Sequence, residues 1–95
     1  MPAYVVVNVT VKDAKRYEDY KALAPGSIEQ YGGKYLARGG KTEVLEGSWK
    51  PNRMVILTFP SVGKAKAWWS STEYAKAKAI RQSCSEADLV VVEGL

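Results

Sequence analysis

Arg38, Gly39 and Gly40 are the sharpest candidates for chemistry in this chain of 95 residues. An arginine can hold a carboxylate or a phosphate through two parallel hydrogen bonds. Adjacent glycines let backbone N–H groups approach a ligand closely. The competing interpretation is structural: the glycines form a bulge in a strand, and Arg38 makes a salt bridge on the surface or between subunits. Neither a G-x-G-x-x-G nor a Walker pattern is present, which argues against a phosphate-binding loop.

Tyr74 and Arg81 are a second set of candidates, in a stretch with helical periodicity. They are two helical turns apart and so share one side of a helix. In one interpretation they join Tyr20 and Arg38 in a polar pocket between helices and sheet, where tyrosine donates to a ligand carbonyl and arginine holds an anion or stabilises an enolate. In the other, Tyr74 packs its ring and Arg81 pairs with a carboxylate such as Asp88.

The three tryptophans divide into a consecutive pair and a single residue in a turn. Trp68 and Trp69 point about 100° apart on a helix, so one can pack in the core while the other lines a cleft, or both can be core. We include Trp68 in the candidate pocket. Trp49 lies near Arg53 in a polar turn, and an indole is costly to leave exposed there. A partner subunit, the mouth of the pocket or Pro51 must cover it, and a partner subunit is the favoured interpretation.

The chain has no histidine and a single cysteine, Cys84. Histidine is the usual general base near neutral pH and the commonest metal ligand. Its absence excludes Ser-His-Asp and Cys-His catalysis and His-ligated zinc or haem for the chain acting alone. The carboxylates show no metal-ligand spacing, so we expect no metal and no bound cofactor. Cys84 has no histidine to activate it and is expected to be a small core or surface residue.

Three features of the sequence bear on its location. No apolar run approaches the roughly 18 residues that a membrane span needs. The first residues enter a predicted strand directly, without the pattern of a secretory signal. A single cysteine also fits a reducing compartment. We therefore expect a cytoplasmic protein with no membrane partner.

Alternation and helical spacing divide the chain into strands and helices. Strands are predicted at 3–11, 34–38, 53–59 and 86–93, and the second of them is broken or bulged at Gly39-Gly40 and resumes at 42–46. A helix is predicted from Asp13, as N-cap, to Gly32-Gly33, with an interruption at Pro25-Gly26. Further helices are predicted at 61–69 and 72–83, and residues 47–52 form a turn.

This order, β-α-β-β-α-β, predicts an α+β fold of the ferredoxin-like type in one domain spanning residues 1–95. Its four-stranded antiparallel sheet has helices on one face only. The other face would carry Val6, Met54, Ile56 and alternate residues of the last strand, which is more apolar surface than a monomer leaves in water. We therefore predict a homodimer with two sheets face to face.

One set of motifs runs through the whole chain. It comprises Tyr17, Tyr20, Gly32 to Gly40, Leu45 to Trp49, Arg53 to Ser61, Ala67-Trp68-Trp69, Ser71 to Tyr74, Arg81 and Val92-Glu93-Gly94. In combination these motifs resemble the family called domain of unknown function 1330, within the dimeric α/β-barrel superfamily. Thr72 departs from the family pattern, which often has proline at this first helical turn, and we expect it to change helix stability and little else.

The resemblance implies a dimeric ferredoxin-like fold and no settled activity. Related families in the superfamily include monooxygenases of polyketide and quinone type, lactone isomerases and haem enzymes. The haem branch with a histidine ligand does not fit a chain that lacks histidine.

Three functions compete on these grounds. The first is a small-molecule enzyme that is cofactor-free or uses a flavin or a quinone-like substrate. It would transfer protons or oxygenate an enolisable ring. Its pocket would be formed by Tyr20, Arg38, Trp68, Tyr74 and Arg81. The second is a non-catalytic ligand-binding or structural dimer. The third, an RNA-binding domain, needs paired aromatics on the exposed sheet face, and strand 53–59 lacks them. The expected partners are thus a second copy and a small aromatic or anionic molecule, without nucleic acid.

Overall fold

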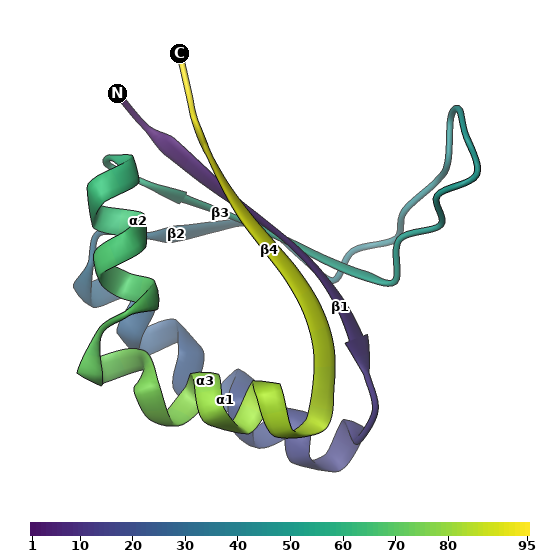
Figure 1. Ribbon diagram of the computed structural model, residues 1–95, viewed down its shortest axis with the longest axis horizontal. Helices are drawn as coiled ribbons and strands as arrows, with labels where there is room; N and C mark the ends of the chain where they lie inside the picture. The colour runs from purple at the N-terminus through teal and green to yellow at the C-terminus, as the bar shows by residue number, and fades with distance from the viewer.

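The computed structural model describes residues 1–95 and has the predicted ferredoxin-like order of elements. The strands are β1 (Ala3–Val11), β2 (Lys34–Arg38), β3 (Arg53–Phe59) and β4 (Ser85–Glu93). The helices are α1 (Ala14–Gln30), α2 (Val62–Trp69) and α3 (Thr72–Cys84). The strands form one antiparallel sheet in the order β2-β3-β1-β4, and all three helices lie on one side of it (Figure 1). None of the helices combines the length and the apolar character needed to span a membrane.

The core lies between the sheet and the helices, and the alternation of β1 builds it. Val5, Val7 and Val9 are buried, while the residues between them are only partly buried. β3 contributes Leu57 and Phe59 to the same side. Burying each of these side chains contributes roughly 1.5–3 kcal/mol, which is why the period-two pattern fixes the face that the helices cover.

Polar caps set the starts of the helices as predicted. Asp13 accepts from the backbone N–H of Arg16 at the start of α1, and Ser61 accepts from that of Lys64 at the start of α2. Ser71 caps α3 by accepting from the backbone N–H of Tyr74. Each cap satisfies one of the backbone donors that a helix start leaves unpaired, worth about 1 kcal/mol.

The interruption predicted at Pro25-Gly26 does not end α1, which continues through both residues to Gln30. Proline has no N–H and therefore leaves the carbonyl four residues earlier, that of Lys21, without its helical partner. Arg38 replaces that partner, because its Nη2 donates to the Lys21 carbonyl oxygen over 3.1 Å. The cost of the proline is offset by a side chain from β2.

The strand predicted at 42–46 does not form. Residues 39–52 contain no helix or strand and extend away from the sheet, and we call this segment the arm (Figure 1). Gly39 has a φ of 70°, which turns the chain out of β2. Beyond that turn the segment has no neighbouring strand to exchange hydrogen bonds with, so its β-branched residues cannot form a ladder.

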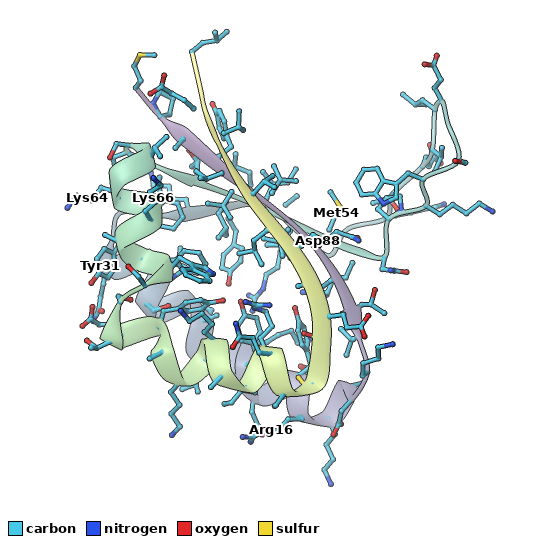
Figure 2. The ribbon with its side chains drawn as sticks, viewed as in Figure 1. Arg16, Tyr31, Met54, Lys64, Lys66 and Asp88 are labelled. Carbon is cyan, nitrogen blue, oxygen red and sulfur yellow. The ribbon has the colours of Figure 1, made fainter.

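The sheet face opposite the helices, the open face, carries no helix and is covered by the chain only at Asn8 and Thr10, where Asn52 is bonded. Val90 and Val92 on β4 are 60% and 52% exposed. Met54 and Asp88 flank Asn8 of β1 in the register, and Figure 2 shows them near each other on the side away from the helices. The open face therefore carries the apolar side chains that the sequence predicted, interrupted by the polar Asn8 and Asp88.

One buried polar pair provides a test of the core. Trp68 Nε1 donates to Ser27 Oγ over 3.1 Å, and Ser27 Oγ donates to the Ala24 carbonyl. Ser27→Ala leaves a buried indole N–H without a partner, so we expect the free energy of unfolding to fall by about 1–3 kcal/mol in a denaturant titration.

Ser83→Ala is the matched control for that variant. Ser83 makes the same kind of hydroxyl bond, to the carbonyl of Ile80, but no tryptophan depends on it. We expect a change within about 0.5 kcal/mol. Equal losses in the two variants would contradict the assigned role of the Ser27–Trp68 bond.

Candidate functional site

A small cavity lies between α1, the N-terminal part of β3 and the helix-facing side of β1. Its volume is about 20 Å³, which is room for about one water molecule. Apolar side chains of the core form most of its wall. The polar and aromatic residues that line it are Tyr17, Tyr20, Lys21, Tyr35, Arg38, Arg53, Trp68 and Arg81.

Tyr20, Tyr74 and Arg81 form a chain of hydrogen bonds at one end of the cavity. The Tyr20 and Tyr74 hydroxyls are 2.9 Å apart, and Arg81 Nε donates to the Tyr74 hydroxyl over 3.4 Å. When Tyr74 donates its own proton to Tyr20, the Tyr20 hydroxyl keeps its proton for a further acceptor. Burial, followed by the neighbouring Tyr74, raises the pKa of Tyr20 above its ordinary value. Tyr20 is therefore neutral, and in that arrangement its hydroxyl is free to donate a hydrogen bond.

Trp68 forms part of the wall behind this chain. Its ring packs on Tyr74 with 4.2 Å between ring centroids and on Phe59 with 5.3 Å. It is almost fully buried, at 1% exposure, and the bond to Ser27 fixes the orientation of the indole. Trp69, the next residue, is partly exposed on α2 with Lys78 Nζ 3.8 Å from its ring centroid.

A bulge in β2 brings Tyr35 and Arg38 to the same side of the sheet. Tyr35 pairs with Leu57 and Arg38 with Val55, and the register shifts between Tyr35 and Ala37. Without the shift, two residues three apart would point to opposite faces. The guanidinium carbon of Arg38 lies 4.7 Å from the centroid of the Tyr35 ring. Burial raises the pKa of Tyr35, against the opposing effect of Arg38.

Arg53 approaches the cavity from the start of β3. Its guanidinium carbon is 5.6 Å from the centroid of the Tyr17 ring, and its Nε is buried without a hydrogen-bond partner. A Cβ at Gly39 would overlap the Arg53 guanidinium, so a larger residue there requires the end of the Arg53 side chain to move. Gly39 uses its own N–H in a 2.7 Å bond to the Met54 carbonyl, so that N–H is already occupied.

The charges around the cavity are unbalanced. Of the four arginines in the chain, only Arg16 makes an ion pair, with Asp19. The other two ion pairs join lysines to glutamates, and no carboxylate lines the cavity. Arg38, Arg53 and Arg81 thus share one cavity without a negative partner, although Arg81 is only 5% exposed. Buried charges in proteins are normally paired, and this arrangement is suited to an anion.

The structure gathers most of the predicted site residues, although they come from four elements. Tyr20, Arg38, Trp68 and Arg81 line the cavity, and Tyr74 is bonded to two of them. Gly39 touches the site only through Arg53, and a Cβ added at Gly40 would meet no atom within 4 Å. No group of histidine, cysteine or acidic residues is placed to hold a metal ion.

Sequence reasoning missed three contributors, Tyr17, Tyr35 and Arg53. Tyr17 is among the family motifs, but its contact with Arg53 depends on the packing of two distant segments. Tyr35 and Arg38 have a spacing that predicts opposite faces in a regular strand. The sequence predicted a break or bulge at Gly39-Gly40, whereas the register shift lies between Tyr35 and Ala37, so the prediction left these two side chains on opposite faces.

Two alternative interpretations of the sequence are wrong. Arg81 does not pair with Asp88, because Asp88 is exposed on the open face while Arg81 is buried on the helix side. Neither Pro51 nor the cavity covers Trp49, which is 62% exposed in the arm. Cys84 is buried, which agrees with the first of its two predicted placements, in the core or on the surface. Burial raises the pKa of its thiol.

Gly39→Ala tests whether the backbone turn and Arg53 are coupled. A non-glycine residue at a φ of 70° is strained and here also collides with Arg53, so we expect the free energy of unfolding to fall by about 1–3 kcal/mol. Gly40→Ala is the control, because it has open space and no positive φ. A denaturant titration in which Gly40→Ala is as destabilising as Gly39→Ala would contradict this account.

Comparison with solved structures identifies relatives of the fold. A protein of unknown function from Rhodopseudomonas palustris matches with a TM-score of 0.80 and 20% identity, over 99% of this chain and 82% of that one. A dimeric ferredoxin-like protein of unknown function from Jannaschia sp. CCS1 matches with a TM-score of 0.73 and 14% identity, over 99% and 100%. SnoaB, a cofactor-independent oxygenase from Streptomyces nogalater, matches with a TM-score of 0.68 and 11% identity, over 99% and 93%. At these identities the likeness establishes the fold alone.

Comparison of sequences is more specific about the family. A search of curated proteins finds no match. The family model described as domain of unknown function (DUF1330) matches residues 2–95, which is nearly the whole chain. The fold agrees with the relatives described as ferredoxin-like. The chain therefore belongs to the DUF1330 family.

Proposed function

We propose that this protein is a single-domain ligand-binding protein that holds a small anion, with an aromatic acid as the best fit, in the cavity lined by Arg38, Arg53 and Arg81. The observation that carries the proposal is that these three arginines line one cavity, that no carboxylate lines it and that none of the three makes an ion pair. A carboxylate is the acceptor that matches the planar fork of an arginine. The Tyr20 hydroxyl adds a neutral donor at the same cavity.

The aromatic lining favours a ligand with a ring. The Arg38–Tyr35 and Arg53–Tyr17 contacts leave flat guanidinium and phenol groups beside the cavity, and such surfaces stack on aromatic rings. A volume of about 20 Å³ accommodates a water and not a ring. Binding therefore requires the wall to move, and the exposed Arg38 is the wall residue whose displacement disturbs the core least.

Cofactor-free oxygenation or isomerisation is the second candidate function. The likeness of the fold to a cofactor-independent oxygenase raises this possibility as an analogy. The observation in its favour is the chain from Arg81 through Tyr74 to Tyr20, which ends at the cavity and can stabilise the oxygen of an enolate. In this function the protein supplies binding and hydrogen bonds, and the substrate itself reacts with oxygen.

We also propose that two copies pair through their open faces in the cytoplasm. The exposed valines of β4 support the pairing, and the free, buried Cys84 suits a reducing compartment. The proposal includes no nucleic-acid partner, because Met54 and Ile56 occupy the open face of β3, where an RNA-binding domain of this fold has aromatic residues.

Calorimetric titration with aromatic carboxylates, such as benzoate and salicylate, and with the corresponding neutral amides tests the main proposal. We expect the acids to bind and the amides to bind at least tenfold more weakly. Arg53→Gln and Arg81→Met should each weaken binding of the acid about ten- to a hundredfold, because a hydrogen bond to a charged group is worth about 1.5–3 kcal/mol.

Arg16→Gln is the matched control, since it removes the same charge at an exposed ion pair far from the cavity. It should leave the dissociation constant of the acid unchanged. Amides that bind as tightly as acids, or an Arg16→Gln variant that loses as much affinity as Arg53→Gln, would contradict the proposal. Oxygen consumption or product formation with a bound ligand separates the enzyme from the binding protein.

A further inference from the structure

The arm leaves the sheet on the side of the open face. Asn52, at the end of the arm, donates from its backbone N–H to Asn8 Oδ1 over 2.8 Å and from its Nδ2 to Thr10 Oγ1 over 2.6 Å. Asn8 and Thr10 alternate with the buried Val7 and Val9, so their side chains lie on the open face. These two bonds fix the root of the arm to that face, and Figure 1 shows the rest of the arm projecting from it.

The tip of the arm is apolar and has nothing to pack against in its own chain. Leu45 is 96% exposed, Trp49 is 62% exposed and Val44 is 47% exposed. Scattered exposed hydrophobics are ordinary, but an aromatic and two aliphatic side chains on one projecting segment mark an interaction surface. Tryptophan in particular is enriched where proteins bind one another.

We propose that the arm packs across the open face of a second copy of this chain, with Leu45 and Trp49 against Val90 and Val92 of the partner's β4. The inference rests on the pairing of open faces proposed above and adds the element that holds the pair together. Because the pairing is two-fold, each arm covers the β4 of the other copy. The arm and the open face lie on the same side of the sheet, so one partner covers both.

Charge supports the second copy as the occupant. On β1, β3 and β4 the charged side chains of the open face are those of Glu86 and Asp88, both exposed on β4. The arm carries Lys41 and Lys50 near its two roots and Glu43 and Glu46 between them. An arm laid along the partner's β4 with its glutamates towards solvent brings the root lysines towards carboxylates and the apolar residues towards valines. The Jannaschia relative is described as dimeric.

Size also favours this arrangement. A stable interface buries about 800 Å² on each partner. Polar residues interrupt the apolar surface of the open face at one end. The arm of each copy adds further apolar side chains to the interface. The arm therefore supplies the large, exposed aromatic group around which tight interfaces are built.

The test is sedimentation equilibrium on the wild type, on a Leu45→Ser/Trp49→Ser variant and on Trp69→Ser, with circular dichroism to check folding. The arm makes no core contact, so the double variant should fold normally. We expect a wild-type dimer whose dissociation constant rises at least tenfold in the double variant. Trp69→Ser, which removes a partly exposed tryptophan from α2, should leave the dissociation constant unchanged.

Two results would overturn the inference in distinguishable ways. A wild type that is monomeric at every concentration would overturn the pairing of open faces and the arm together. A double variant that dimerises as tightly as the wild type would overturn the role of the arm and leave the pairing standing.

Carbodiimide cross-linking of mixed heavy- and light-isotope copies provides the second measurement. We expect links from Lys41 or Lys50 to Glu86 or Asp88 that join one heavy and one light chain. The Lys12–Glu86 pair, 4.0 Å apart within one chain, is the internal control for the reaction. Arm links confined to single chains would overturn the proposal.

Discussion

Three guanidinium groups without a negative partner are the feature on which the rest of this structure depends. Removing an ion from water is expensive, and proteins offset that cost with a counter-charge or with hydrogen bonds to every donor. Here Arg38 is exposed, Arg53 is partly buried and Arg81 is buried, and tyrosines take the place of a counter-charge. Arg38 stacks on Tyr35, Arg53 lies over Tyr17, and Arg81 donates to Tyr74. Phenol rings stabilise a cation without neutralising it, so the cavity keeps a positive charge for a ligand.

Several local departures from regular structure serve to hold these arginines. Pro25 removes a helical hydrogen bond and so frees the Lys21 carbonyl, which Arg38 uses as its anchor. The bulge in β2 turns Arg38 to the helix side. Gly39 leaves the space that the Arg53 guanidinium occupies. Each feature is unfavourable or unusual in isolation, and proteins tend to concentrate such features at functional sites.

The fold follows from local patterns that the sequence displays. The alternating valines of β1, the caps at Asp13, Ser61 and Ser71, and the break between α2 and α3 are all consequences of short-range chemistry, and each was predictable. Strand 42–46 was predicted as the continuation of the second strand beyond Gly39-Gly40 and does not form, because it has no neighbouring strand with which to exchange hydrogen bonds.

The site was predictable only in part, since its geometry is long-range. Arg38, Tyr74 and Arg81 stood out by residue type and helical spacing. The predicted pairing of Arg81 with Asp88 is wrong. The two residues are close in the sequence, but Arg81 is buried on the helix side of the sheet and Asp88 is exposed on the open face. Tyr17 and Arg53, 36 residues apart in the sequence, meet only after the sheet and α1 have packed together.

The arginine side chains report on the central claim directly. Each has one Nε–H group, and Arg16, in its own ion pair with Asp19, serves as the internal reference in nitrogen–proton NMR spectra. On titration with an aromatic carboxylate we predict that the Nε–H signals of Arg38, Arg53 and Arg81 shift together with one dissociation constant, while that of Arg16 stays in place. If the three signals do not move, or if Arg16 moves with them, the cavity is not an anion site.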